Sequence, residues 1–317
     1  IKLTCQGGKY GAGIGGSKDG IKNFSQGHGV NLHFGSLATN IYGGEISAIS
    51  GVYGAGIGGG QGGVGEQIYV YSGKLTVRSV SEGAGIGGGQ GGPGRFIYIK
   101  GGTVNAGSES GGAGIGSGDQ DGQNKSEDAH HIEISGGTVE AWSNYAGAGI
   151  GGGRDGSGYD ISITGGVVRA QGYFGAGIGG GDSGIGENIT ITDGTVTATG
   201  GIYGAGIGGG KESSGSNVTV RGAAQVTATA GKSNGYYGAG ATIGSGGNET
   251  GGEPVDGDEI QADIIAVTTG YIHHIIYKPD LDSDGKPDGI LKEWWEPERP
   301  QPNPGAPAPT TPSGCRP

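Results

Sequence analysis

Sulfur-containing residues are almost absent from this sequence. It has no methionine and two cysteines in 317 residues, and Cys5 and Cys315 lie near opposite ends of the chain. A framework of disulfide bonds is therefore not expected. No run of about 18 apolar residues occurs, so the sequence predicts no transmembrane helix. Because the sequence starts at Ile1, we expect that a signal peptide has been removed from a secreted, extracellular protein.

Basic residues are also few. The chain has 19 Lys and Arg against 30 Asp and Glu, which gives a formal net charge of −11. The basic residues are spread thinly, so no basic stripe is available to neutralise phosphate groups or anionic lipids. We therefore expect neither nucleic acid nor a membrane surface as a partner.

Glycine, in contrast, is in large excess, with 83 of 317 residues. The glycines do not follow the three-residue period of collagen, and β-branched segments separate their clusters. A glycine motif, Gly-Ala-Gly-Ile-Gly with two variants, begins at residues 11, 54, 83, 112, 147, 175, 204 and 238. The shortest intervals are 28 to 29 residues, and the longer ones fit the same unit with loop insertions. This period indicates a β-solenoid with one coil per copy.

Between the glycine motifs lies a second block with period-two alternation, at residues 97–106, 132–141, 161–170 and 189–198. Each block predicts two short strands joined at Gly-Gly or Asp-Gly. The alternation places Ile97, Ile99 and Val104 inside and the intervening side chains outside. With the glycine motif as a third strand, whose Ala and Ile point inward, the sequence predicts an all-β, single-domain parallel β-helix. It has about eight coils of 28–29 residues and three short strands per coil.

The outward glycines of the motif, such as Gly54, Gly56 and Gly58, allow two interpretations. In the first, they occupy corners that need a positive φ or the close approach of another backbone. In the second, they form a flat strip without side chains on which a polymer lies.

Aromatic residues fall into three groups when the outward positions are projected onto successive coils. Tyr69, Tyr71 and Tyr98 form one cluster, and Trp142 projects from a polar surface. A third group precedes the glycine motifs and would edge the glycine strip. Aromatic faces beside hydrogen-bonding groups suit sugar rings, although stacks that only stabilise the fold are the alternative. The candidate carbohydrate-binding residues are Trp142, Tyr69, Tyr71, Tyr98, Tyr145, Tyr173, Phe174, Tyr203, Glu140 and Arg169.

No catalytic residues are predicted. Glycoside hydrolysis needs two carboxylates roughly 5 to 10 Å apart, and the acidic residues here are scattered over loops. They are Asp119, Asp121, Glu127 and Asp128 in one insertion, and Asp155, Asp160, Asp182 and Glu187 in later loops. Solvated acidic loops explain them better than an active site. Adjacent strand residues are expected to face opposite ways, so the pairs at 130–131 and 273–274 do not predict a zinc site.

A cluster of aspartates near the C-terminus has the pattern of a calcium loop. Asp280, Asp282, Asp284 and Asp288 can converge on a hard cation around Gly285. The segment resembles the thrombospondin type 3 and dockerin class of calcium loops. It departs from an EF-hand because the twelfth position is Leu291 rather than Glu, which leaves Glu293 as a substitute. We expect calcium in a structural role, with a plain acidic turn as the alternative.

The sequence predicts four parts: a parallel β-helix at 1–252, a C-terminal capping strand region at 253–279, the acidic loop at 280–296 and a proline-rich linker at 297–317. Residues 264–277 are expected to cap the last coil, with 291–296 folded against them. A linker at this position predicts a covalently linked catalytic domain in the parent protein. We expect the protein to be a monomer.

The glycine motifs, alternating with segments such as 189–198, look like the repeats of secreted gut or rumen bacterial proteins that degrade polysaccharides or coat the cell surface. The chain most resembles the β-helical carbohydrate-binding modules of xylanases, over residues 1 to about 250. The resemblance implies a right-handed parallel β-helix, an extracellular setting and binding of a plant polysaccharide such as xylan. A β-helical glycoside hydrolase or polysaccharide lyase is the alternative, and a surface adhesin or fibre subunit is the third possibility.

Overall fold

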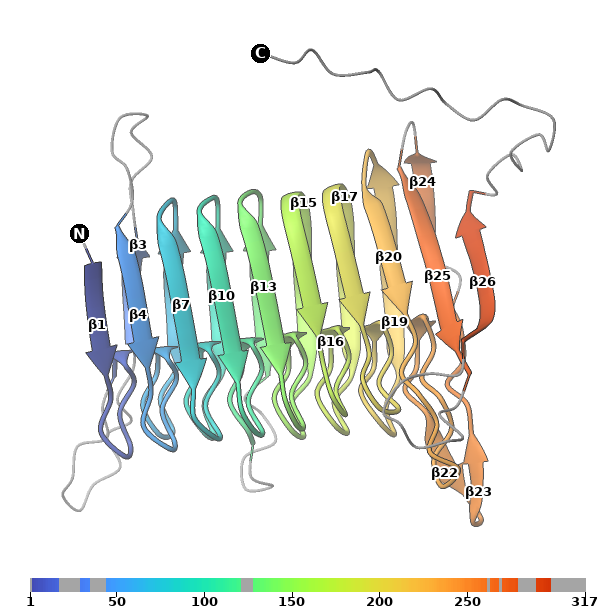
Figure 1. Cartoon of the computed structure of the whole chain (residues 1–317), viewed down its shortest axis with the longest axis horizontal. Coiled ribbons are helices and arrows are strands. Elements are labelled where there is room, and N and C mark those ends of the chain that lie inside the picture. The colour runs from blue at the N-terminus through green and yellow to red at the C-terminus, as the bar shows by residue number, and fades with distance from the viewer. Residues whose placement is uncertain are drawn as a thin grey trace, which may run out of the picture.

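The chain is all-β and forms a right-handed parallel β-helix, which confirms the predicted fold (Figure 1). The computed structural model describes residues 2–16, 29–34, 44–120, 128–260, 263–267, 270–278 and 289–297. Each coil has three sides, and equivalent strands of successive coils pair in parallel. Several residues of interest lie outside the described ones: the proposed calcium ligands Asp280, Asp282, Asp284 and Asp288, the acids Asp121 and Glu127, and Cys315 with the rest of the proline-rich segment from residue 298.

Two sides of the coil are long, and the strands of β15 (Gly158–Gln171) and β17 (Gly186–Thr199) run continuously across both. Side one is completed by β3 (Gly29–Phe34), β6 (Gly65–Val70), β9 (Gly94–Ile99), β12 (Ala129–Ile134), β19 (Gly215–Gly222) and β24 (Asp263–Val267). Side two is completed by β1 (Lys2–Gln6), β4 (Glu45–Ile49), β7 (Lys74–Ser79), β10 (Thr103–Ser108), β13 (Thr138–Ser143), β20 (Gln225–Thr229) and β25 (Tyr271–Tyr277). Figure 1 shows side two as a row of long arrows.

Side three is short, with two residues per coil. Its strands form an eight-stranded parallel sheet. They are β2 (Ile14–Gly15), β5 (Ile57–Gly58), β8 (Ile86–Gly87), β11 (Ile115–Gly116), β14 (Ile150–Gly151), β16 (Ile178–Gly179), β18 (Ile207–Gly208) and β21 (Ile243–Gly244). The predicted third strand is therefore present in each glycine motif, although it is only two residues long. The Ala55 N–H donates to the Gly59 carbonyl at 2.8 Å, so the motif closes a tight turn instead of extending as a longer strand.

Ladders of isoleucine and valine fill the interior of the coils. Ile57 pairs with Ile86, Ile86 with Ile115 and Ile115 with Ile150, and all four side chains are fully buried. The predicted inward residues of the long sides, including Ile97, Ile99 and Val104, are buried as well. A fully buried side chain of this size contributes roughly 1.5–3 kcal/mol relative to an exposed one. Because each ladder crosses many coils, stacking supplies the core.

The glycine strip is not an open surface, because Gly54, Gly56 and Gly58 are all buried. Gly58 has a φ of 134°, and a Cβ added to it would lie 2.0 Å from the carbonyl oxygen of Gly87 on the next coil. A Cβ on Gly56 would lie 2.4 Å from a methyl carbon of the inward-pointing Val77. The polymer-strip interpretation is therefore wrong, and the corner interpretation is confirmed.

Side one contains a bulge at the same position of successive coils. Pairing joins Glu66 with Arg95 and then Ile68 with Ile97, so the residue between them stays outside the ladder. That residue has a left-handed φ of 50–57° in Gln67, Phe96, His131, Asp160, Asn188 and Asn217. The bulge turns two consecutive side chains of each strand toward solvent. The expectation that His130 and His131 face opposite ways is therefore wrong: their Nδ1 atoms are 2.8 Å apart.

The C-terminal end of the helix is covered by a hairpin. Strand β26 (Ile290–Glu296) pairs antiparallel with β25, so residues 291–296 fold against the capping strand as expected. The imidazole of His274 stacks on Trp294 at 4.3 Å between ring centroids, and His273 stacks on Trp295 at 3.9 Å. A smaller antiparallel hairpin, β22 (Asn248–Thr250) and β23 (Glu253–Val255), precedes this cap.

Candidate functional site

The ten candidate binding residues lie on three separate surfaces. Register places Tyr69 beside Tyr98 on side one, whereas Glu140 and Arg169 are paired neighbours on side two. The remaining residues precede the glycine turns. The side-one set is Tyr69, Tyr71 and Tyr98, the side-two set is Glu140, Trp142 and Arg169, and the corner set is Tyr145, Tyr173, Phe174 and Tyr203. A single sugar-binding surface cannot use all three sets.

The tyrosines of side one stack on each other. The rings of Tyr69 and Tyr98 are 4.8 Å apart with 13° between their planes, and Tyr69 and Tyr71 are 6.1 Å apart with 9° between theirs. All three side chains are half-buried. Burial, followed by the proximity of Tyr69 and Glu133, raises the pKa of Tyr98. Because Tyr69 and Tyr98 stack on each other, each ring covers one face of the other.

The corner residues form a second aromatic stack along the helix axis. Phe174 stacks on Tyr203 at 5.8 Å with an interplanar angle of 5°, and Tyr203 contacts Tyr237 at 5.1 Å. Tyr203 is only 4% exposed, so the prediction that it binds carbohydrate is wrong, because its neighbours on both coils enclose it. Tyr145 and Tyr173 are 47% and 38% exposed. The centre of the corner stack is therefore buried and stabilises the fold.

Trp142 has a different orientation, because its indole lies over a glycine. A Cβ added at Gly107 would be 2.1 Å from indole Cε2, 2.2 Å from Cζ2 and 2.5 Å from Cδ2. Similar distances to three ring atoms mean that the ring plane lies above the Gly107 backbone at van der Waals separation. One face of the indole therefore packs on β10, and the opposite face points away from the sheet.

Hydrogen bonds hold the Trp142 ring in this position. The indole N–H donates to Asn105 Oδ1 at 3.2 Å, and the Asn105 amide donates to Glu140 Oε2 at 2.9 Å. Register places Arg169 beside Glu140 and Gln171 beside Trp142 on the next coil. The Trp142 ring on β10, called the Trp142 platform below, is thus surrounded by hydrogen-bond donors and acceptors. We did not predict Asn105, Gly107 and Gln171 as site residues. Their outward positions next to Trp142 on the projected coils could have indicated them.

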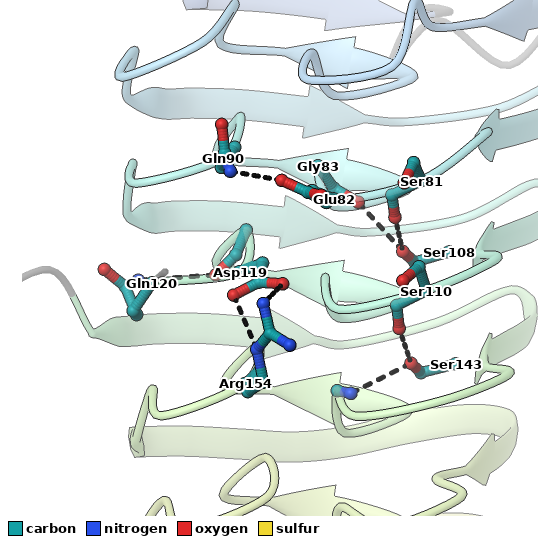
Figure 2. A network of polar contacts seen from close by, with 12 residues as sticks. Ser81, Glu82, Gly83, Gln90, Ser108, Ser110, Asp119, Gln120, Ser143 and Arg154 are labelled. Carbon is teal, nitrogen blue, oxygen red and sulfur yellow. Dashed lines mark hydrogen bonds and ion pairs between the residues drawn. The ribbon is translucent and has the colours of Figure 1, made fainter. Parts of the chain in front are cut away.

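Asp119, the first of the acidic candidates, is not part of a solvated loop. Its side chain is 1% exposed, and Arg154 on the next coil binds both carboxylate oxygens at 2.6 and 3.0 Å (Figure 2). In the same view, Gln90 donates to Glu82 one coil earlier. The expectation of an exposed acid was wrong here because the Asp119 N–H donates to the Glu82 carbonyl of the preceding coil at 2.7 Å, which places Asp119 within the stacked turns. Asp119 links two coils and has no access to a substrate.

Serine hydroxyls satisfy backbone groups at the end of side two. Ser108 donates to the Gly83 carbonyl at 2.9 Å (Figure 2). Ser143 donates to the Gly112 carbonyl, also at 2.9 Å. These serines are buried and pair in register. Within the described residues, no group of three or more His, Cys, Asp or Glu side chains is arranged to hold a metal ion. The described part of the chain also contains no helix that could span a membrane.

Comparison with known proteins concerns the repeats. Residues 40–61, 97–119, 132–154, 161–182 and 189–211 match the family model described as "Beta helix repeat". The segment at 97–119 contains β10 and the following glycine turn, and the other segments contain the equivalent elements. Comparisons with curated proteins and with solved structures gave no match. The match agrees with the observed fold and leaves the ligand to be argued from the surface.

Proposed function

We propose that this parallel β-helix repeat protein is a non-catalytic carbohydrate-binding module, which holds a neutral plant cell-wall polysaccharide such as xylan against side two. The observation that carries the proposal is the Trp142 indole lying flat on Gly107 with its other face turned outward. Sugar rings stack their C–H faces on aromatic faces of this kind. The rod-like stack of coils offers a polymer several neighbouring strands to cross.

The polar surroundings of Trp142 support the same proposal. Asn105 and Glu140 are fixed by their mutual hydrogen bond, and Arg169 and Gln171 project from the next coil. Sugar hydroxyls both donate and accept hydrogen bonds, so a mixture of amide, carboxylate and guanidinium groups suits them. The net charge of −11 disfavours polyanions such as pectin.

The proposed setting follows from the sequence expectations. The module is secreted and monomeric, and its proline-rich linker joins it to a catalytic domain. Binding would hold that domain close to its polymeric substrate and raise the effective substrate concentration. Calcium bound by Asp280, Asp282, Asp284 and Asp288 would have a structural role only.

The surroundings of the acidic residues favour a non-catalytic role over a hydrolase. Asp119 is 1% exposed and is bound by Arg154, so it cannot reach a substrate. Glu140, the carboxylate beside Trp142, accepts a hydrogen bond from the Asn105 amide at 2.9 Å. A reducing-sugar assay on the isolated protein tests this point, and product release would establish the enzyme alternative.

The binding proposal is tested by affinity electrophoresis in gels that contain xylan, mannan, cellulose derivative or pectin. The wild type should be retarded most by a neutral polymer, and Trp142→Ala should weaken binding about 10- to 30-fold. Tyr98→Ala and Tyr145→Ala are the matched aromatic controls from the other two surfaces, and both should bind as the wild type. Unchanged retention of Trp142→Ala would refute side two as the binding surface.

A further inference from the structure

The bulged strands of side one enclose a pocket that is separate from the Trp142 platform. Its volume is about 330 Å³. Its polar lining comes from Arg95 on β9, Asp128 and His130 at the start of β12, Tyr159 and Asp160 on β15, and Asn188 on β17. The coil of Arg95 and the three coils that follow it therefore contribute to one pocket. The alternating pattern alone does not predict this pocket.

The left-handed residues create the pocket. Asp160 and Asn188 have φ values of 50° and 57°. Each directly follows another residue of the same strand whose side chain points outward. Consecutive outward side chains such as Tyr159 and Asp160 can then meet those of the next coil. Non-glycine residues in this region are strained, and such strain often accompanies functional sites. From His131 onward, the residues at this position are polar: His131, Asp160, Asn188 and Asn217.

Hydrogen bonds orient both carboxylates of the pocket. Asp160 Oδ1 accepts from the Asn188 amide at 3.1 Å, and Asp128 Oδ1 accepts from the Ser157 N–H at 2.7 Å. These bonds use one oxygen of each carboxylate. The second oxygen of Asp160 is 3.8 Å from Nδ1 of His131.

The histidines and the arginine define the charge of the pocket. Burial, with His131 and Arg95 nearby, lowers the pKa of His130. Its Nδ1 lies 2.8 Å from Nδ1 of His131, so Nε2 is the nitrogen that remains for a ligand. Arg95 already binds Glu66 Oε2 at 2.8 and 3.0 Å. Its charge is therefore balanced by Glu66, and the two aspartates leave the pocket negative.

We propose that this pocket on side one is a second carbohydrate site, which binds one or two neutral sugar units and is separate from the Trp142 platform on side two. The aspartates accept hydrogen bonds from sugar hydroxyls, Nε2 of His130 adds a further hydrogen bond, and the Tyr159 ring offers an apolar contact. Asn188 orients Asp160. The negative charge excludes uronic acids and phosphorylated sugars. The inference extends the proposed function, because a rod with sites on two sides can bind two chains at once.

Titration calorimetry with short oligosaccharides tests this site separately from polymer binding. The probes are neutral xylotriose and mannotriose and the anionic galacturonate trimer. Asp160→Asn keeps a residue that tolerates a left-handed φ and keeps an acceptor for Asn188, but removes the charge. It should weaken binding of the neutral trimer about ten-fold and should increase binding of the galacturonate trimer relative to the neutral one. His130→Gln should weaken neutral binding to a similar extent.

The controls separate the pocket from the platform. Thr190→Ala, on side one outside the pocket, should bind the trimers as the wild type. Trp142→Ala should lose polymer retention but keep the pocket-dependent trimer affinity. Wild-type trimer affinity in both Asp160→Asn and His130→Gln would overturn the pocket, whatever the polymer assay gives. Retained polymer binding by Trp142→Ala together with loss in Asp160→Asn would refute the platform and leave the pocket standing.

Discussion

Trp142 on β13 lies across Gly107 on the neighbouring strand β10, so close that a Cβ at position 107 would fall 2.1 Å from the indole. The φ of Gly107 is outside the left-handed region, so the backbone itself does not require glycine there. Glycine is required at position 107 because the indole occupies the space where a Cβ would lie. Glycine at 107 and tryptophan at 142 therefore form one unit that spans two coils.

Gly107→Ala should disturb this unit without unfolding the protein. The new methyl group must lift the indole off the sheet and break its hydrogen bond to Asn105, so polysaccharide affinity should fall several-fold. Affinity electrophoresis measures the change. The control is the same substitution in the Trp142→Ala background, where it should have no further effect. An equal loss in both backgrounds would contradict the contact.

Gly151→Ala should destabilise the fold. Gly151 has a φ of 131°, and an added Cβ would lie 1.9 Å from the carbonyl oxygen of Gly179. Backbone strain and overpacking together predict a loss of roughly 2–6 kcal/mol in the free energy of unfolding. Denaturant unfolding measures it. Gly8→Ala is the matched control, because that exposed position has nothing within 4 Å, and its effect should stay within about 0.5 kcal/mol.

Arg154→Ala should destabilise more than Asp119→Asn. Asp119 is 1% exposed whereas the Arg154 side chain is 40% exposed, so removal of the arginine leaves a buried carboxylate without its guanidinium. Loss of one partner of a fully buried pair costs about 3–5 kcal/mol, and the exposure of Arg154 reduces this to roughly 2–3 kcal/mol. Urea unfolding compares the variants with Arg221→Ala, an exposed control on β19. The reverse order would argue against burial of the charge.

The cap should weaken as the pH falls. Burial, aided by the charges of His273 and Lys292, lowers the pKa of His274 from 6.5 to about 4. The unfolded chain therefore binds a proton that the folded chain rejects, so stability present above about pH 6.5 is lost progressively toward pH 4. Thermal unfolding between pH 5 and 7 should show a smaller pH slope for His274→Gln than for the wild type. Equal slopes would assign the pH dependence to other groups.

Calcium should stabilise the same cap. The segment 279–288 connects β25 to β26, and at its base the Lys278 N–H donates to the Gly289 carbonyl at 2.8 Å. A cation that is bound by Asp282 and Asp284 in the folded chain alone would raise the melting temperature. Differential scanning calorimetry with calcium or a chelator measures the shift, and the double variant Asp282→Asn/Asp284→Asn should not respond. Identical melting with and without calcium would favour a plain acidic turn.

The alternation of residues such as Ile97, Ile99 and Val104 was sufficient to predict the long sides and their core, because side-chain direction in a strand follows directly from position. The same rule failed at His130 and His131, where a left-handed residue in the strand turns both side chains outward. A bulge leaves no simple sign in a single sequence, since Gln, Phe, His, Asp and Asn occupy the same position on successive coils.

The sequence by itself determined the solenoid, its period and the columns that bring Glu140 beside Arg169, because a fixed repeat makes equivalent residues neighbours. Only the tertiary structure decided which outward residues are accessible. Tyr203 is enclosed, Asp119 is buried against Arg154, and the indole of Trp142 lies over Gly107. The reason is that accessibility depends on how the turns fold over adjacent coils and how rings tilt. Those contacts join residues of different coils, and local patterns do not encode them.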